Sequence, residues 1–151
     1  MGMEHVTDPA ELVGALRTAR VRLDHGQSPY IKMTGAVFPP EAIAAAEKDQ
    51  DIVVPVVPGL DGVILAQVEA RPDTFSMEEF ETPAIDGCET THCRAGWAVH
   101  FAGEAGRVLK RLYGYGIAGA LIYAKSCPGL PVPDFYSDAE SYAIADMRRR
   151  A

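Results

Sequence analysis

The residues whose types could carry chemistry gather in fourteen consecutive positions, residues 87–100. This stretch holds two of the three cysteines, two of the four histidines and the only tryptophan: Cys88, Cys93, His92, His100 and Trp97. Thiols and imidazoles are the side chains that most often act as nucleophiles, bases and soft metal ligands. We therefore expect any reaction centre of this protein to lie here.

A thiol nucleophile at Cys93 is the first interpretation. Cys93 is expected in the first turn of a helix, where unpaired backbone N–H groups favour the thiolate and would stabilise an oxyanion. His92 or His100 would act as the base. However, His100 lies two helical turns, or about 10 Å, from Cys93, which is too far for a direct hydrogen bond. A partner from another segment would then be needed, and His5 and His25 are the remaining histidines.

A metal site is the second interpretation. Cys88, Cys93 and Cys127, together with His92 or His100, would supply four soft ligands for zinc. The spacing is unfavourable, because the two neighbouring cysteines are not followed by a matched second pair. In addition, adjacent side chains such as His92 and Cys93 diverge by about 100° on a helix. We therefore expect no cofactor, with zinc as the alternative.

A structural role is the third interpretation, and the one we favour. Cysteine is among the most buried residue types, and Trp97 is suited to filling a core. Thr90 or Thr91 would cap the helix by accepting a backbone N–H bond. In this case the motif holds residues 72–90 on a helical core, and function belongs to a surface.

Composition and charge limit the classes of function. The 151 residues suit one domain, and 48% apolar with 23% charged residues is an ordinary globular balance. A formal net charge of -7 argues against a nucleic-acid partner. The basic cluster Arg148–Arg150 ends the last predicted helix and is interpreted as its C-terminal cap, where positive charge suits the helix dipole. No apolar run approaches the ~18 residues of a membrane span, and the N-terminus lacks a signal-peptide pattern. We expect a cytoplasmic protein with reduced thiols.

The N-terminal part predicts alternating helices and strands. Asp8, Pro9 and Glu11 are an N-cap, a first-turn proline and a capping glutamate, and they predict a helix over residues 9–24. Strand-forming residues at 30–34 and 51–57 predict two strands, separated by a short helix that begins near Pro40.

The remainder predicts helices. Residues 60–70 favour a helix over a strand, and the extended, proline-rich segment 127–134 precedes a terminal helix with a cap at Ser137. Between them we expect helices from Thr91 to Ala102, 104–113 and 117–125, with breaks at Gly103 and Gly114. The expected fold is a single α+β domain, residues 1–151. A small strand-containing unit, residues 1–57, packs beside a mainly helical part, residues 58–151.

Five blocks of this sequence resemble an uncharacterised family of bacterial and phage-borne proteins. The family has a C-terminal segment reading Cys-x-Thr-Thr-His-Cys-x-Ala-Gly-Trp, which follows pentapeptide repeats in some members. The blocks that carry the resemblance are residues 88–97, 102–106, 120–123, 132–136 and 145–149. The resemblance covers residues 52–151. It implies a bacterial or mobile-element setting and supplies no reaction.

The absence of a complete catalytic set in the sequence favours a non-enzymatic function. We expect a small cytosolic binding or regulatory protein that acts on a protein partner, with neither nucleic acid nor membrane as partner. The alternative is a thiol-dependent enzyme with Cys93 as nucleophile and His92 or His100 as base.

Overall fold

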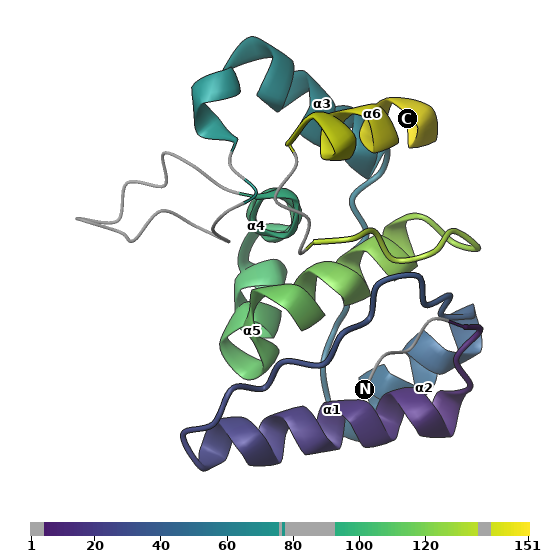
Figure 1. The fold of residues 1–151 in the computed structure, drawn as a ribbon. Coiled ribbons are helices and arrows are strands. Elements are labelled where there is room, and N and C mark those ends of the chain that lie inside the picture. The colour runs from purple at the N-terminus through teal and green to yellow at the C-terminus, as the bar shows by residue number, and fades with distance from the viewer. Residues whose placement is uncertain (1–4, 76, 78–92, 136–139) are drawn as a thin grey trace.

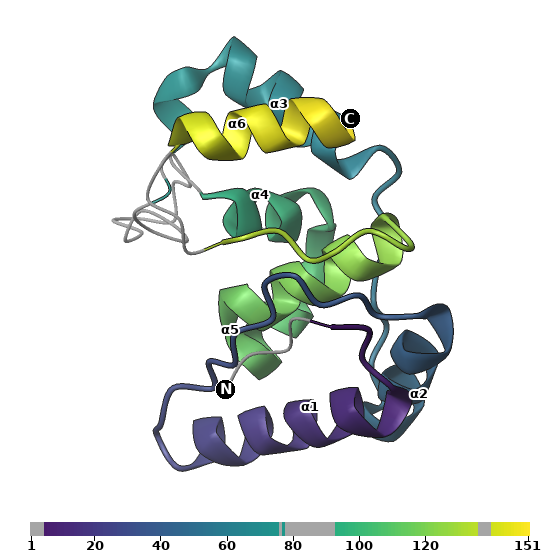
Figure 2. The same cartoon turned by 45° about the vertical axis from the view of Figure 1, so that its right-hand side comes forward.

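The structure is a computed structural model that describes residues 5–75, 77, 93–135 and 140–151. These residues form six α-helices and one 3₁₀ turn, η1. Their bounds are α1 Pro9–Asp24, α2 Pro40–Gln50, α3 Leu60–Ala70, η1 Pro72–Thr74, α4 Arg94–Phe101, α5 Gly103–Ser126 and α6 Glu140–Arg150. Figure 1 and Figure 2 show α1 beside α2 at one end, α3 beside α6 at the other, and α4 with α5 between them. The site must therefore be built on helices.

The expected α+β fold is wrong, because the described part of the chain contains no strand and no sheet. Residues 30–34 and 51–57, predicted as strands, do not pair with each other. Val6 and Val37 form one isolated parallel bridge, which is too short to be a sheet. Nearby, Val132 exchanges two backbone hydrogen bonds with residues 35 and 36. The N-terminal part is two helices joined by extended chain.

The extended segment 51–57 shows why strand propensity predicted a strand that does not form. Val54 and Val57 are buried whereas Val53 and Val56 are exposed, so burial repeats every three residues, as in a polyproline II helix, rather than every two. Two of its backbone donors bind side chains instead of a neighbouring strand. The Val54 N–H donates to Glu47 Oε2 at 2.8 Å and the Val57 N–H donates to Ser126 Oγ at 2.9 Å.

Several helices lie where the capping residues and the apolar spacing of the sequence predict them. Helix α1 has the predicted bounds, and its Asp8 side chain accepts the Glu11 N–H at 2.8 Å. Residues 60–70 are confirmed as a helix, α3. Segment 127–134 is confirmed as non-helical. The cap predicted at Ser137 lies outside the described residues.

The central helices differ from the prediction in two details. Helix α5 runs through the two helices expected at 104–113 and 117–125, but the predicted break is present at Gly114, whose φ of 84° lies in the left-handed region. Helix α4 begins at Arg94, so Cys93 is its extended N-cap residue and not part of its first turn. Among the helices that the structure describes, none combines the length and the apolar character needed to cross a bilayer.

Helices α4 and α5 pack closely at a glycine. A Cβ built on Gly119 would lie 3.0 Å from the Ala95 Cβ and 3.2 Å from the Ala95 Cα. Small residues on both helices let the backbones approach, so the start of α4 is held against the middle of α5.

Candidate functional site

Cys93 is buried at the entrance of α4, with 1% of its surface exposed. Burial raises the pKa of its thiol to about 11, and hydrogen bonds from the backbone N–H groups of Gly96 and Ala95 offset only part of this effect. The thiol is therefore protonated at neutral pH. A nucleophilic cysteine needs the opposite shift.

The other residues of the predicted reaction centre do not complete it within the described residues. His100 is exposed on α4, and its ring packs edge-on against Trp97 at 5.1 Å between centroids. Cys127 is half-buried at the C-terminal end of α5. His92 and Cys88 lie outside the described residues.

Within the part of the chain that the structure describes, no set of ligands supports the zinc alternative. No group of three His, Cys, Asp or Glu side chains there has a geometry suited to a metal ion. Cys93, Cys127 and His100 therefore do not form such a site together. Cys88 and His92, the other residues named for it, lie outside the described residues.

Alkylation tests the state of Cys93. At neutral pH we expect iodoacetamide to leave Cys93 unmodified in the native protein and to modify it rapidly after unfolding, because only the thiolate reacts and burial disfavours it. Labelling of native Cys93 should rise only as the pH approaches 11, whereas the unfolded thiol should label near pH 9. Peptide mapping by mass spectrometry gives the rate. Fast native labelling below pH 7 would instead support the thiol enzyme.

A buried ionic network surrounds the next residue, Arg94, the first residue of α4. Its Nη2 donates to Asp61 Oδ1 on α3 and its Nη1 to Asp146 Oδ2 on α6, both at 2.7 Å. Its Nε donates to the Tyr123 hydroxyl on α5 at 3.0 Å, and that hydroxyl donates to Asp61 Oδ1 at 2.7 Å. Arg94 and Asp61 are only 1% and 3% exposed. One guanidinium thus joins four helices.

The protonation states inside the network follow from these contacts. Burial alone would lower the pKa of Arg94, but Tyr123 and Asp61 beside it outweigh that effect and raise it. Burial raises the pKa of the Tyr123 hydroxyl. Arg94 is therefore charged and Tyr123 neutral, so the tyrosine can both accept and donate a hydrogen bond.

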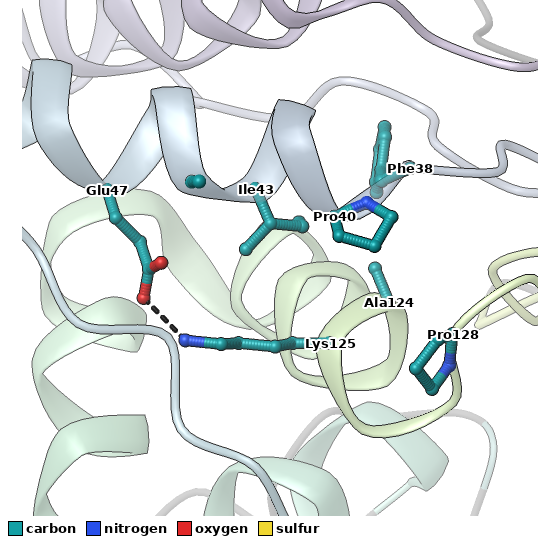
Figure 3. Close-up of a pocket in the computed structure, with 8 residues that line it drawn as sticks. Phe38, Pro40, Ile43, Glu47, Ala124, Lys125 and Pro128 are labelled. Atoms are coloured by element: carbon teal, nitrogen blue, oxygen red, sulfur yellow. Dashed lines mark hydrogen bonds and ion pairs between the residues drawn. The ribbon is translucent and has the colours of Figure 1, made fainter.

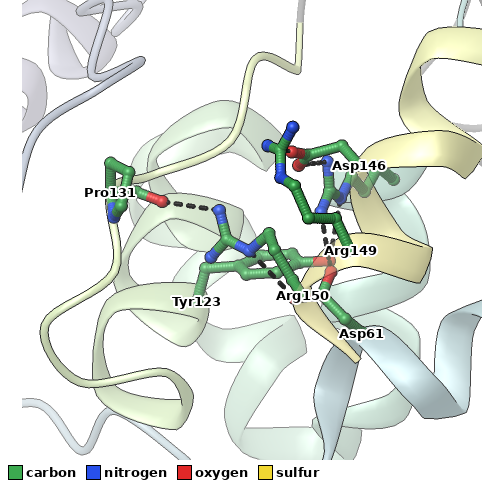
Figure 4. A network of polar contacts seen from close by, with 7 residues as sticks. Asp61, Tyr123, Pro131, Asp146, Arg149 and Arg150 are labelled. Carbon is green, nitrogen blue, oxygen red and sulfur yellow. Dashed lines mark hydrogen bonds and ion pairs between the residues drawn. The ribbon is translucent and has the colours of Figure 1, made fainter.

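Arg150 closes the network from the end of α6, as Figure 4 shows. Its Nε donates to Asp61 Oδ2 at 3.1 Å and its Nη1 to the Pro131 carbonyl at 2.8 Å. Its guanidinium lies over the Tyr123 ring, 5.4 Å from the centroid. The sequence predicted the cluster Arg148–Arg150 only as a helix cap, whereas Arg150 is a buried link between α6, α3 and the segment after α5.

An apolar pocket of about 190 Å³ lies between α2 and the C-terminal end of α5 (Figure 3). Its lining combines apolar side chains with one ion pair: Phe38, Pro40, Ile43, Ala44, Glu47, Ala124, Lys125 and Pro128. The Lys125 Nζ lies 2.7 Å from Glu47 Oε2. Burial favours a higher pKa for Glu47, but the bonds from Lys125 and the Val54 N–H outweigh it and lower the pKa. Glu47 is therefore ionised and holds α2, α5 and segment 51–57 together.

Two exposed valines follow Glu47 along the chain. Val53 is 68% exposed and Val56 is 53% exposed, on the segment that Glu47 anchors through Val54. Large apolar side chains with this exposure contribute to a contact surface only if they form a patch with other apolar groups.

No family model, curated protein or solved structure matches this chain. The resemblance carried by residues 88–97 stays a prediction.

Sequence analysis missed most of the residues that define these two features. Arg94 was noted only as part of the Cys/His/Trp stretch, although an arginine within a nearly continuous apolar helix is a signal for a buried ion pair. Asp61 carries the same signal, because it is a carboxylate among the apolar residues that begin α3. Tyr123 gave none, because a tyrosine is common in an apolar helix. The pocket residues belong to segments that were assigned only to packing.

Proposed function

We propose that this protein is a small binding or regulatory protein that acts through contact with a protein partner. The observation that carries the proposal is the apolar pocket between α2 and α5. An apolar pocket on a protein surface is a typical anchor site for a side chain of a binding partner.

The size of the pocket supports a partner side chain over a small-molecule ligand. Its volume of about 190 Å³ lies below the ~300–1,000 Å³ of sites that enclose drug-sized molecules. Its walls are apolar, and its only charged groups, Glu47 and Lys125, neutralise each other. The pocket therefore favours an uncharged, apolar anchor.

The state of the thiol also supports binding over catalysis. Cys93 is buried with a raised pKa, and Arg94 is bound on all three nitrogens. These groups stabilise the helix entrance and are not presented to a substrate. The thiol-dependent enzyme with Cys93 as nucleophile would require the entrance of α4 to open first.

We further propose a cytoplasmic location in a bacterium or a mobile element. This rests on the resemblance of residues 88–97 to the phage-borne family and on the thiol usage of the chain. Regulation of a host or phage protein would suit a small acidic chain that carries one apolar contact site.

A random peptide library selected on the purified protein tests the proposed contact. We expect a family of enriched peptides that share an apolar anchor residue and that lose binding at least tenfold to the Ala44→Glu variant. Ala44 lines the pocket and is itself exposed, so the added carboxylate blocks the pocket without disturbing the core.

The matched control is Ala66→Glu, the same change at an exposed position in the middle of α3, outside the pocket lining. This variant should bind the selected peptides as the wild type does. Peptides that bind Ala44→Glu and Ala66→Glu equally well, or the absence of any enriched family, would contradict the proposal.

A further inference from the structure

The chain between α2 and α3 contains the sequence Val-Val-Pro-Val-Val-Pro at residues 53–58. Its prolines, Pro55 and Pro58, are three residues apart, and a residue that precedes a proline favours extended or polyproline II backbone. Residues 52–57 belong to no helix or strand, and Figure 2 shows them running from α2 at one end of the molecule to α3 at the other. The proline spacing thus indicates the same polyproline II conformation as the burial of every third residue.

A polyproline II helix has three residues per turn and therefore three faces. One face, formed by Val54 and Val57, is buried on the protein itself. The residues left partly or fully exposed are all apolar and form the other two faces: Val53 and Val56 on one, and Ile52, Pro55 and Pro58 on the other. Two apolar faces of the segment are therefore open to a partner.

Hydrogen bonds hold this segment on the protein without occupying its exposed carbonyl groups. Two of its N–H groups donate to the side chains of Glu47 and Ser126. The carbonyls of Val53, Pro55 and Val56 accept no hydrogen bond from any residue that the structure describes. An aromatic-lined groove can use both features, because tryptophan and tyrosine rings pack on the apolar faces while their N–H and O–H groups donate to the carbonyls.

Addition of a partner strand is the other way in which an extended segment is recognised. A strand ladder requires N–H and C=O groups at regular positions along the edge. The two prolines have no N–H, and the N–H groups of the two buried valines are already bound. Among residues 53–58 only Val53 and Val56 keep an N–H without an acceptor in the described part of the chain. The segment therefore suits a groove better than a strand.

The charge next to the segment is negative. Asp51 directly precedes it and is exposed, and its carboxylate forms no hydrogen bond or ion pair with the residues that the structure describes. A basic side chain at the matching end of the groove would complement this charge.

We propose that residues 51–58 are a preformed polyproline II ligand that docks into an aromatic-lined groove of a partner protein, with a basic side chain of the partner beside Asp51. Because the bonds to Glu47 and Ser126 already fix the segment, docking costs little conformational entropy. This contact surface goes beyond the apolar pocket, since none of residues 51–58 lines that pocket.

An array of purified SH3, WW and EVH1 domains, which bind polyproline II segments, tests the proposal with the whole protein as probe. PDZ and PTB domains, which pair with extended strands, are included for comparison. We expect at least one domain of the first three classes to bind, and Val56→Asp to weaken that binding at least tenfold. No binding to these three classes, or binding to PDZ or PTB domains alone, would overturn the proposal.

Val21→Asp is the matched control. Val21 lies on α1 and is 58% exposed, close to the 53% of Val56, so both variants place a carboxylate on the surface without touching the core. Val21→Asp should bind as the wild type does. Equal binding by Val21→Asp and Val56→Asp would contradict the proposed contact.

Two further variants separate the segment from its surroundings. Asp51→Asn keeps a residue that tolerates the left-handed backbone at this position, where φ is 53°, and removes only the charge. It should weaken binding about threefold at low ionic strength, where charge pairs are least screened, and unchanged binding would contradict the basic side chain beside Asp51. Ala44→Glu, which blocks the apolar pocket, should leave domain binding unchanged. Loss of binding in Ala44→Glu would instead assign the contact to the pocket and overturn the role of the segment.

Discussion

Arg94→Met is expected to lower the free energy of unfolding by about 3 kcal/mol. The change removes the charge that compensates Asp61 and Asp146, whose residues are 3% and 7% exposed. Methionine fills much of the space of the arginine stem, so the loss reports on the weaker compensation of the two carboxylates and not on a cavity. Arg150 and Arg149 still bind these two carboxylates, which keeps the expected loss near the lower end of the range for broken buried pairs.

Urea denaturation followed by circular dichroism measures this effect. Arg107→Met is the matched control, because Arg107 pairs with Glu104 on the exposed face of α5, where an ion pair contributes only about 0–1 kcal/mol. Adding Asp146→Asn to the Arg94→Met protein should recover part of the loss, since one uncompensated charge is removed. If Arg94→Met costs no more than Arg107→Met, the network does not hold the four helices together.

Trp97→Ala should lower the free energy of unfolding by about 3–5 kcal/mol. Trp97 is 4% exposed and is stacked on Phe101 with 5.6 Å between ring centroids. Its Nε1–H donates to the Thr74 carbonyl at 3.0 Å, which joins α4 to η1. The substitution therefore removes both core volume and the link between these two segments.

Trp97→Phe separates the two contributions. Phenylalanine keeps most of the apolar contact but cannot donate to the Thr74 carbonyl, so a loss of about 1–2 kcal/mol is expected. Circular dichroism is the appropriate probe, because Trp97 is the only tryptophan and its removal abolishes tryptophan fluorescence. Hydrogen exchange at the Thr74 amide should accelerate in both variants. A loss for Trp97→Ala no larger than that for Trp97→Phe would show that the core closes around the missing ring.

The prediction that Trp97 is a core residue is confirmed. A helix does begin within the Cys/His/Trp stretch, but its N-cap residue is Cys93 and not the predicted Thr90 or Thr91, which lie outside the described residues. The side chain that connects the start of α4 to three other helices is Arg94, to which sequence analysis assigned no role of its own. Its three bonds reach residues 33, 29 and 52 positions away, and no local pattern reports such separations.

Local signals in the sequence determined the helices. Asp8, Pro9 and Glu11 set the start of α1, and Gly114 set the break in α5, because capping and left-handed backbone depend on residues adjacent in the chain. The apolar spacing of residues 60–70 likewise determined α3. These elements follow from short-range energetics alone.

Tertiary structure alone decided whether the valine-rich segment 51–57 became a strand. Strand propensity measures fit to a pleated neighbour, and here the neighbours are Glu47 and Ser126, whose side chains take the backbone hydrogen bonds. The tertiary structure also decided the roles of Asp61, Tyr123 and Arg150. Their charges and hydroxyl become one buried network only because α3, α5 and α6 bring them within hydrogen-bonding distance, where the low dielectric makes each partner necessary to the others.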